Sequence, residues 1–152
     1  MPEYSGRPAD SFRFKNILYA KRIGRAYVTF NRPHVLNAVD GDTLVELNEA
    51  FADAAWDDDV GVLILTGAGD RAFCTGADVK EQADEFLGRP SNYWKWMGLF
   101  IQCHERLRNI GKPTIARLNG MVVGGGNEFN LSCDLAVAAE HVTIRQVGAA
   151  RG

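Results

Sequence analysis

The feature that most constrains this fold is the uninterrupted apolar run at residues 60–66, Val-Gly-Val-Leu-Ile-Leu-Thr. It does not alternate between apolar and polar residues, as a strand with one face in water would. A run of this kind is typical of a strand buried on both faces, in the interior of a parallel sheet. Helical patterns precede and follow it, so that the chain divides into about three strand–loop–helix units. We therefore predict an α/β fold.

Periodicity and turn residues place the other elements. We expect strands at residues 16–23, 26–30, 113–118, 121–123, 135–139 and 142–146, and helices at 41–56, 78–86, 91–110 and 126–133. Thr43 and Glu46 have the spacing of a capping box for the first helix, and Ser91 can cap the third. Residues 1–15 are expected to be a flexible leader, and residues 16–152 to form one domain. The chain stops in a loop, so we expect this domain to be truncated at its C-terminus.

The third predicted helix carries one apolar stripe and two tryptophans. The stripe consists of Met97, Phe100, Ile101, His104 and Leu107. Its position on this stripe predicts that His104 packs in the core. Trp94 and Trp96 cannot share one helix face, so one is expected to pack and the other to contact a ligand or a neighbouring subunit.

Composition excludes several functional classes. The net charge of −2 gives no basic footprint for nucleic acid or for an anionic membrane surface. No apolar stretch approaches the ~18 residues that span a bilayer. The three cysteines, Cys74, Cys103 and Cys133, form no C-x-x-C pair, which argues against a zinc site or a disulfide framework. We therefore expect a cytoplasmic protein without a bound metal.

A first glycine-rich site follows the apolar strand. The segment Gly67-Ala-Gly69-Asp-Arg-Ala72 matches the pattern G-x-G-x-x-[GA] of dinucleotide-binding loops. That fingerprint must open a helix, whereas residues 73–76, Phe-Cys-Thr-Gly, are poor helix formers. Cys74 in this loop is expected to be a small packing residue. Binding of NAD is therefore not favoured.

A second glycine-rich site is more specific. Gly124, Gly125 and Gly126 follow an apolar strand and precede a helical stretch that contains Glu128. The first N–H groups of a helix have no internal partner, so they can stabilise a developing oxyanion. Glu128 in the first turn is a candidate general acid or base. A tight turn that needs glycine, with a glutamate that only complements the helix dipole, is the structural alternative.

The two glycine sites together resemble the enoyl-CoA hydratase/isomerase (crotonase) family. The segment Ala72-Phe-Cys-Thr-Gly-Ala-Asp-Val79 is similar to its first oxyanion segment, and residues 112–128 are similar to its second. The segment Asn31-Arg-Pro-His-Val-Leu-Asn-Ala38 resembles an early turn that contacts CoA. The resemblance covers roughly residues 16–152. It implies a spiral of ββα turns, of which this chain holds the N-terminal part without the C-terminal helices.

The resemblance also implies a set of site residues. The N–H groups of Ala77 and Gly125 would form the oxyanion hole for a thioester, and Glu128 would be catalytic. The positions implied for substrate or CoA binding are Val35, Leu36, Ala38, Ala72, Cys74, Gly76, Asp78 and Gly124. CoA would be part of the substrate, so no separate cofactor is implied. The full-length protein would be a homo-oligomer, a trimer or hexamer.

The chain departs from the hydratase pattern at one position. Gly148 stands where a hydratase has its second catalytic glutamate. The segment Gln146-Val-Gly148 instead resembles the corresponding segment of the branch that acts on cyclic oxo-acyl-CoAs. Within that branch it is most similar to the oxocyclohexene-carbonyl-CoA hydrolases. Residues 88–97 also resemble that branch. A generic enoyl-CoA hydratase or isomerase, a non-catalytic acyl-CoA-binding or scaffold protein, and a truncated product without function are the alternatives.

Overall fold

A large sheet forms the centre of the computed structural model, which describes residues 5–151. It has five strands in the order β1-β2-β3-β5-β7. The hairpin of β1 (Ile17–Arg22) and β2 (Arg25–Phe30) is antiparallel, and the remaining pairs are parallel. The other strands are β3 (Val62–Gly67), β5 (Thr114–Leu118) and β7 (Leu135–Ala138). The apolar run identified in the sequence thus forms the middle strand of this sheet.

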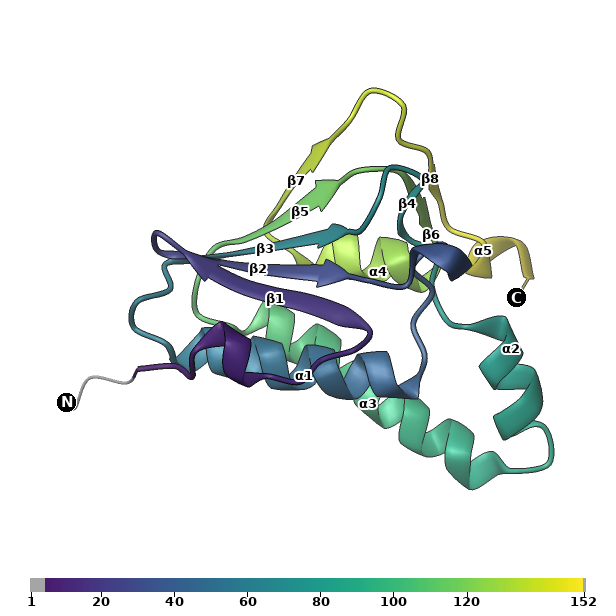
Figure 1. Cartoon of the computed structure of the whole chain (residues 1–152). Helices are drawn as coiled ribbons and strands as arrows, with labels where there is room; N and C mark the ends of the chain where they lie inside the picture. The colour runs from purple at the N-terminus through teal and green to yellow at the C-terminus, as the bar shows by residue number, and fades with distance from the viewer. Residues whose placement is uncertain (1–4, 152) are drawn as a thin grey trace.

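A smaller sheet lies beyond the carboxyl ends of these strands (Figure 1). Its three parallel strands are β4 (Ala72–Cys74), β6 (Met121–Val123) and β8 (Ile144–Arg145), in the order β4-β6-β8. Each follows one strand of the large sheet along the chain: β4 follows β3, β6 follows β5, and β8 follows β7. A helix follows each pair. The predicted spiral of ββα units is therefore confirmed.

The helices differ greatly in length. They are η1 (Ala9–Ser11), η2 (Pro33–Val35), α1 (Gly41–Trp56), α2 (Val79–Glu81), η3 (Gln82–Phe86), α3 (Pro90–Arg108), α4 (Gly125–Ser132) and α5 (Gly148–Arg151). α1 and α3 pack against each other on one face of the large sheet (Figure 1). None of the helices between residues 5 and 151 is long and apolar enough to cross a membrane.

Three phenylalanines join the two sheets to α4. Phe30 on β2, Phe73 on β4 and Phe129 on α4 are almost fully buried. The ring of Phe30 contacts the rings of Phe73 and Phe129 at centroid distances of 5.5 and 5.4 Å, both edge to face. Burial of such a side chain stabilises a fold by about 2–3 kcal/mol. This cluster fixes the start of α4 relative to β4.

The start of α1 differs from the predicted capping box. Asp40 is the N-cap, and its side chain accepts a hydrogen bond from the Thr43 N–H at 2.8 Å. Glu46 instead accepts hydrogen bonds from the backbone N–H groups of residues 15–17 at the entry to β1. The carboxylate satisfies strand donors because β1 begins close to this turn of the helix.

The start and the buried face of α3 also differ from expectation. Arg89 is the N-cap and Pro90 the first helical residue, so Ser91 lies inside the helix. Pro90 fits this position because its ring presets the helical φ and it has no N–H to satisfy. Ile101 is 55% exposed, and Cys103 is buried in its place. His104 is buried, as predicted, and of the two tryptophans Trp96 packs while Trp94 is exposed.

The described residues before β1 contact α1. Residues 1–4 lie outside the described part of the chain. From Arg7 onward the segment makes specific contacts: the Arg7 N–H donates to Asp53 at 2.7 Å, and the guanidinium pairs with Glu49. Phe12 is buried and its ring meets that of Tyr19 edge to face. The buried ring of Phe12 explains why this mostly polar segment packs against the rest of the protein.

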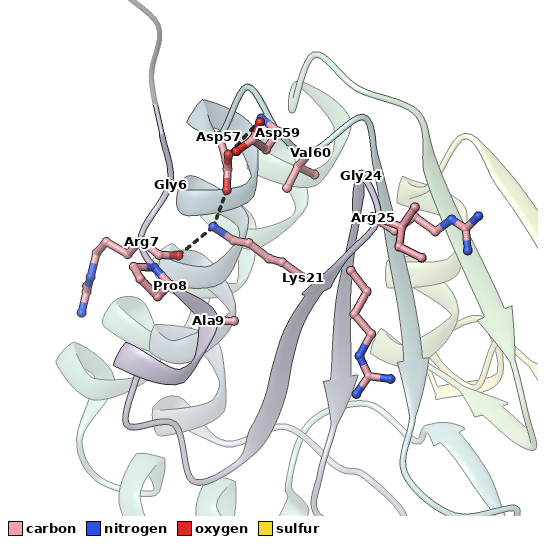
Figure 2. Close-up of a pocket in the computed structure, with 12 residues that line it drawn as sticks. Gly6, Arg7, Pro8, Ala9, Lys21, Gly24, Arg25, Asp57, Asp59 and Val60 are labelled. Carbon is pink, nitrogen blue, oxygen red and sulfur yellow. Dashed lines mark hydrogen bonds and ion pairs between the residues drawn. The ribbon is translucent and has the colours of Figure 1, made fainter.

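One lysine links that segment to the helix. Lys21 Nζ lies 2.5 Å from Asp53 and 2.5 Å from Asp57, and it donates to the Arg7 carbonyl at 2.9 Å, as Figure 2 shows for Asp57 and Arg7. Arg7, Lys21 and Asp57 border a cavity of about 390 Å³ beside the β1–β2 hairpin. Burial would raise the pKa of Asp57, but hydrogen bonds from Lys21 and from backbone N–H groups outweigh it and lower that pKa.

We expect Lys21→Met to destabilise the protein by about 3 kcal/mol at pH 7, because two buried carboxylates lose their counter-ion. A carboxyl with a lowered folded-state pKa contributes stability above its unfolded pKa of about 4, and loses it as pH falls further. The difference in the free energy of unfolding between wild type and variant should therefore be smaller in acid. Urea unfolding at pH 7 and pH 3 measures it, and an equal difference at both pH values would contradict this account.

Candidate active site

The Gly76–Ala77 peptide is fixed by hydrogen bonds on both sides. The Val39 N–H donates to the Gly76 carbonyl at 2.8 Å, and the Asp78 N–H donates to the Val39 carbonyl at 2.8 Å. A trans peptide is planar, with its C=O and N–H on opposite sides. Because the Gly76 carbonyl faces Val39, the Ala77 N–H faces the other way. Gly76 has φ +89°, a conformation that favours glycine.

A second peptide is oriented at the start of α4. The Gly124 carbonyl accepts hydrogen bonds from the N–H groups of Asn127 and Glu128 at 2.8 and 3.1 Å. It therefore points along the helix, and the N–H of Gly125 in the same peptide plane points away from it. Gly124 itself has φ +54°. Neither Gly125 nor Ala77 donates its N–H to another group within residues 5–151.

These two peptides lie against each other. A Cβ built on Gly76 would be 2.9 Å from the Gly125 nitrogen, and one on Gly125 would be 3.3 Å from the Gly76 Cα. A Cβ on Gly126 would overlap with the Cys74 carbonyl. Glycine is required at Gly76 and Gly126 because backbone meets backbone there, and a Cβ on Gly125 would be crowded by the Phe100 ring and the Gly76 Cα. Two unpaired N–H groups next to each other can stabilise negative charge on a single oxygen atom.

Glu128 lies half-buried in the first turn of α4 and has a side-chain partner. Gln146 Nε2, following β8, donates to Glu128 Oε1 at 3.3 Å. Gln146 Oε1 in turn accepts from Asn127 Nδ2 at 3.1 Å, and Asn127 Oδ1 accepts from Asn130 Nδ2 at 3.2 Å. Since the Gln146 oxygen is occupied by Asn127, its NH₂ group is the end that faces Glu128. The chain of amides thus orients one carboxylate oxygen and leaves the other available.

Neither Gln146 nor Asn127 was identified from the sequence as a partner of Glu128. The only signal was the segment Gln146-Val-Gly148, which the resemblance singled out for another reason. Gly148 begins α5, and a Cβ on it would lie 3.9 Å from Gln146 Nε2. Gly148, where the resemblance would place a second glutamate, therefore lies next to the Gln146 amide that contacts Glu128.

An aromatic layer on α3 supports the start of α4. Trp96, Phe100 and His104 lie one turn apart, and consecutive rings are 5.1 and 4.3 Å apart. The Phe100 ring closes on Gly125: a Cβ there would be 3.1 Å from Phe100 Cζ. His104 stacks on Phe129 at 4.3 Å, and its Nδ1 is 2.7 Å from the Phe100 carbonyl. Burial lowers the pKa of His104, so this histidine packs as a neutral ring.

The turn predicted to contact CoA lies beside the Gly67–Ala72 loop. Asn37 is buried, and its Nδ2 donates to the carbonyls of Ala68 and Ala72 at 3.1 and 2.8 Å. Leu36 and Ala72 border a small cavity of about 80 Å³ between the turn and the loop. Val35 ends η2 directly before Leu36, and the buried Ala38 follows Asn37. The structure thus brings the two predicted CoA-binding segments together.

Cys74 is not a nucleophile in this arrangement. It is fully buried, and burial raises the pKa of its thiol to about 12. Its Sγ accepts a hydrogen bond from the Gly76 N–H at 3.4 Å, so it supports the loop before Ala77. The preceding glycine loop runs into strand β4 and not into a helix, which is incompatible with the dinucleotide fingerprint. No group of possible metal ligands is present in the described part of the chain.

Two peptide N–H donors held together, a carboxylate in the adjacent helical turn and successive ββα units define the class of protein. The chain belongs to the enoyl-CoA hydratase/isomerase family, whose sequence profile matches residues 21–152. It is 33% identical over 152 residues to the 6-oxocyclohex-1-ene-1-carbonyl-CoA hydrolase of Geobacter metallireducens. That alignment covers 100% of this chain and 39% of the other protein.

Solved structures show the same fold. The enoyl-CoA hydratase of Bacillus anthracis superposes with a TM-score of 0.85 at 29% identity, over 91% of this chain and 53% of that one. DspI of Pseudomonas aeruginosa superposes with a TM-score of 0.86 at 32% identity, over 95% and 58%. The chain therefore spans about half the length of these solved chains, and a smaller share of the hydrolase. The α/β crotonase-like fold is confirmed for the N-terminal portion.

Proposed function

We propose that this protein processes acyl-CoA thioesters by binding the thioester oxygen between the N–H groups of Ala77 and Gly125. The observation that carries the proposal is the contact between the Gly76 and Gly125 backbones, with both N–H groups unpaired within residues 5–151. As charge moves onto the oxygen, each donor stabilises it more strongly than in the ground state. Loss of one such donor typically raises a barrier by about 3–4 kcal/mol.

Glu128 acts as the general base for the attacking water. Gln146 occupies Oε1, so Oε2 takes the proton while the carbonyl is polarised by the two N–H groups. Proton transfer of this kind contributes roughly 10²–10⁴-fold to the rate. A single carboxylate suits the addition of one water to an activated double bond, followed by proton return from the same residue.

The substrate proposed is a cyclic oxo-acyl-CoA, with water added to the ring and, in a further step, to a ring C–C bond. Two observations support it: Gly148 in place of a second carboxylate, and the similarity to a hydrolase of a 6-oxocyclohexene-carbonyl thioester. Generic hydration or isomerisation of an enoyl-CoA is the second candidate, supported by the similarity to the enoyl-CoA hydratase of Bacillus anthracis.

We further propose that the protein is a cytoplasmic homo-oligomer, a trimer or hexamer. The CoA moiety of its substrate would lie along residues 35–38 and 72–78. The three free cysteines support a reducing compartment. Apolar side chains exposed on α4, β7 and β8 support burial against further polypeptide: Leu131, Leu135, Val137 and Ile144.

The test is to incubate the protein with a linear enoyl-CoA and with a cyclic oxo-enoyl-CoA, and to follow the thioester products by mass spectrometry. If the ring is cleaved, the product of the cyclic substrate should be heavier by two waters and carry a new carboxylate. Gain of one water, by the linear substrate only, would favour the generic hydratase. Binding of both thioesters without conversion of either would show a binding protein.

A further inference from the structure

Arg32 connects the stretch before α1, at Ala38 and Asp40, to Asp78 at the start of α2. Its Nη2 lies 3.0 Å from Asp40 Oδ2 and 2.9 Å from Asp78 Oδ2, and its Nη1 donates to the Ala38 carbonyl at 2.7 Å. The three charged side chains are only 14–18% exposed. Asp78 directly follows Ala77, and Ala38 belongs to the turn proposed to contact CoA.

Both aspartates divide their oxygens in the same way. Asp40 Oδ1 accepts from the Thr43 N–H and caps α1, while Asp78 Oδ1 accepts from the N–H groups of Lys80 and Glu81 and caps α2. In each case Oδ2 is left for the guanidinium. One arginine therefore sets the distance between the N-termini of two helices, and with it the path of the chain at Ala77.

The backbone beside Asp78 shows why this distance matters. The pair of hydrogen bonds from Val39 to Gly76 and from Asp78 to Val39 turns the Ala77 N–H outward. Val39 follows Ala38 and precedes Asp40, both of which Arg32 holds. If Asp78 moved relative to Asp40, this two-bond bridge would break and the Ala77 peptide would be free to rotate.

We propose that Arg32 is a positioning residue that holds the Ala77 N–H in the orientation needed to polarise a thioester carbonyl. This inference rests on the proposed function, and it assigns to the Arg32–Asp78 ion pair a role beyond stability. Burial would raise the pKa of Asp78, but hydrogen bonds from Arg32 and from backbone N–H groups lower it, so the pair is charged at neutral pH. A lysine could replace the charge but not the planar fork that reaches Asp40, Asp78 and Ala38 at once.

The experiment compares Arg32→Met with the matched control Lys21→Met, which removes another cation held by two carboxylates, at the C-terminal end of α1. The first readout needs no ligand: amide hydrogen exchange at Val39 and Asp78, measured by NMR. We expect exchange at these two amides to be at least about tenfold faster in Arg32→Met than in Lys21→Met.

The second readout is the absorption band of a bound arylacryloyl-CoA, which shifts to longer wavelength when its carbonyl is polarised. Wild type and Lys21→Met should show the shift. Arg32→Met should bind the thioester within a few-fold of wild type and lose most of the shift, and Arg32→Lys should recover part of it. Arg32→Met combined with Asp78→Asn should lose no more than Arg32→Met alone, because the two residues act as one unit.

The outcomes separate the two levels of the proposal. An unchanged shift and unchanged exchange in Arg32→Met would overturn the positioning role and leave an ion pair that only stabilises the fold. If Arg32→Met does not fold, Arg32→Lys decides by the same two readouts. Absence of thioester binding or of the absorption shift in wild type would contradict the proposed function. The exchange rates would still show whether Arg32 holds the backbone at Ala77 in place.

Discussion

Replacing Glu128 by glutamine is expected to lower turnover by about 100- to 10,000-fold, while acyl-CoA affinity stays within a few-fold of wild type. Glutamine keeps the shape of the side chain and can still contact Gln146, but it cannot take a proton from water. The N–H groups of Ala77 and Gly125 are untouched, so binding and polarisation of the thioester should remain. Steady-state rates combined with calorimetric binding separate the two effects.

Glu140→Gln is the matched control, because Glu140 is exposed and lies in the loop after β7. It makes the same change of charge and should leave both rate and affinity unchanged. Turnover at the wild-type rate in Glu128→Gln would exclude Glu128 as the general base.

Replacing Gly76 by alanine is expected to reduce turnover by about 100- to 1,000-fold, the effect of losing one oxyanion donor. The added Cβ would be 2.9 Å from the Gly125 nitrogen, so one of the two peptides must shift. The positive φ of Gly76 adds about 1–2 kcal/mol of strain for an L-residue. Rate measurements and thermal unfolding of the same variant follow the two consequences.

Gly88→Ala distinguishes strain from loss of the site. Gly88 has a similar positive φ of +78°, and a Cβ there meets nothing within 4 Å. This variant should lose stability through strain alone and keep its rate. Equal losses of activity in the two variants would show that the Gly76 effect comes from general destabilisation.

The regular elements were largely predictable because their patterns are local. The helix at residues 41–56 was placed with its observed bounds, and strands β1, β2, β3, β5, β6 and β7 agree within a few residues. Strand β4 (Ala72–Cys74) was missed, because it lies in a segment that was expected to be a glycine-rich loop. The cap of the helix at residues 41–56 was not predicted. Glu46 accepts hydrogen bonds from the backbone at the entry to β1, and Asp40, not Thr43, is the N-cap. Tertiary contacts decide such competitions, and residue spacing within one helix does not contain them.

The candidate site was predictable only in part. Gly76 and Gly125 were singled out by motifs, and the structure supplies the reason in their backbone contact. Arg32 lies 46 residues from Asp78, and Gln146 lies 18 residues from Glu128. Pairings over such distances depend on how the strands are ordered in the two sheets. The sequence contains the residues but not their proximity.

The most direct measurement is the infrared carbonyl stretch of a bound acyl-CoA labelled with ¹³C at the thioester carbon. If the Ala77 and Gly125 N–H groups both donate to the thioester oxygen, the stretch must move to lower frequency in the complex than in water. The shift should shrink in Gly76→Ala and persist in Glu128→Gln. A stretch at its aqueous frequency in the wild-type complex would contradict carbonyl activation by this pair.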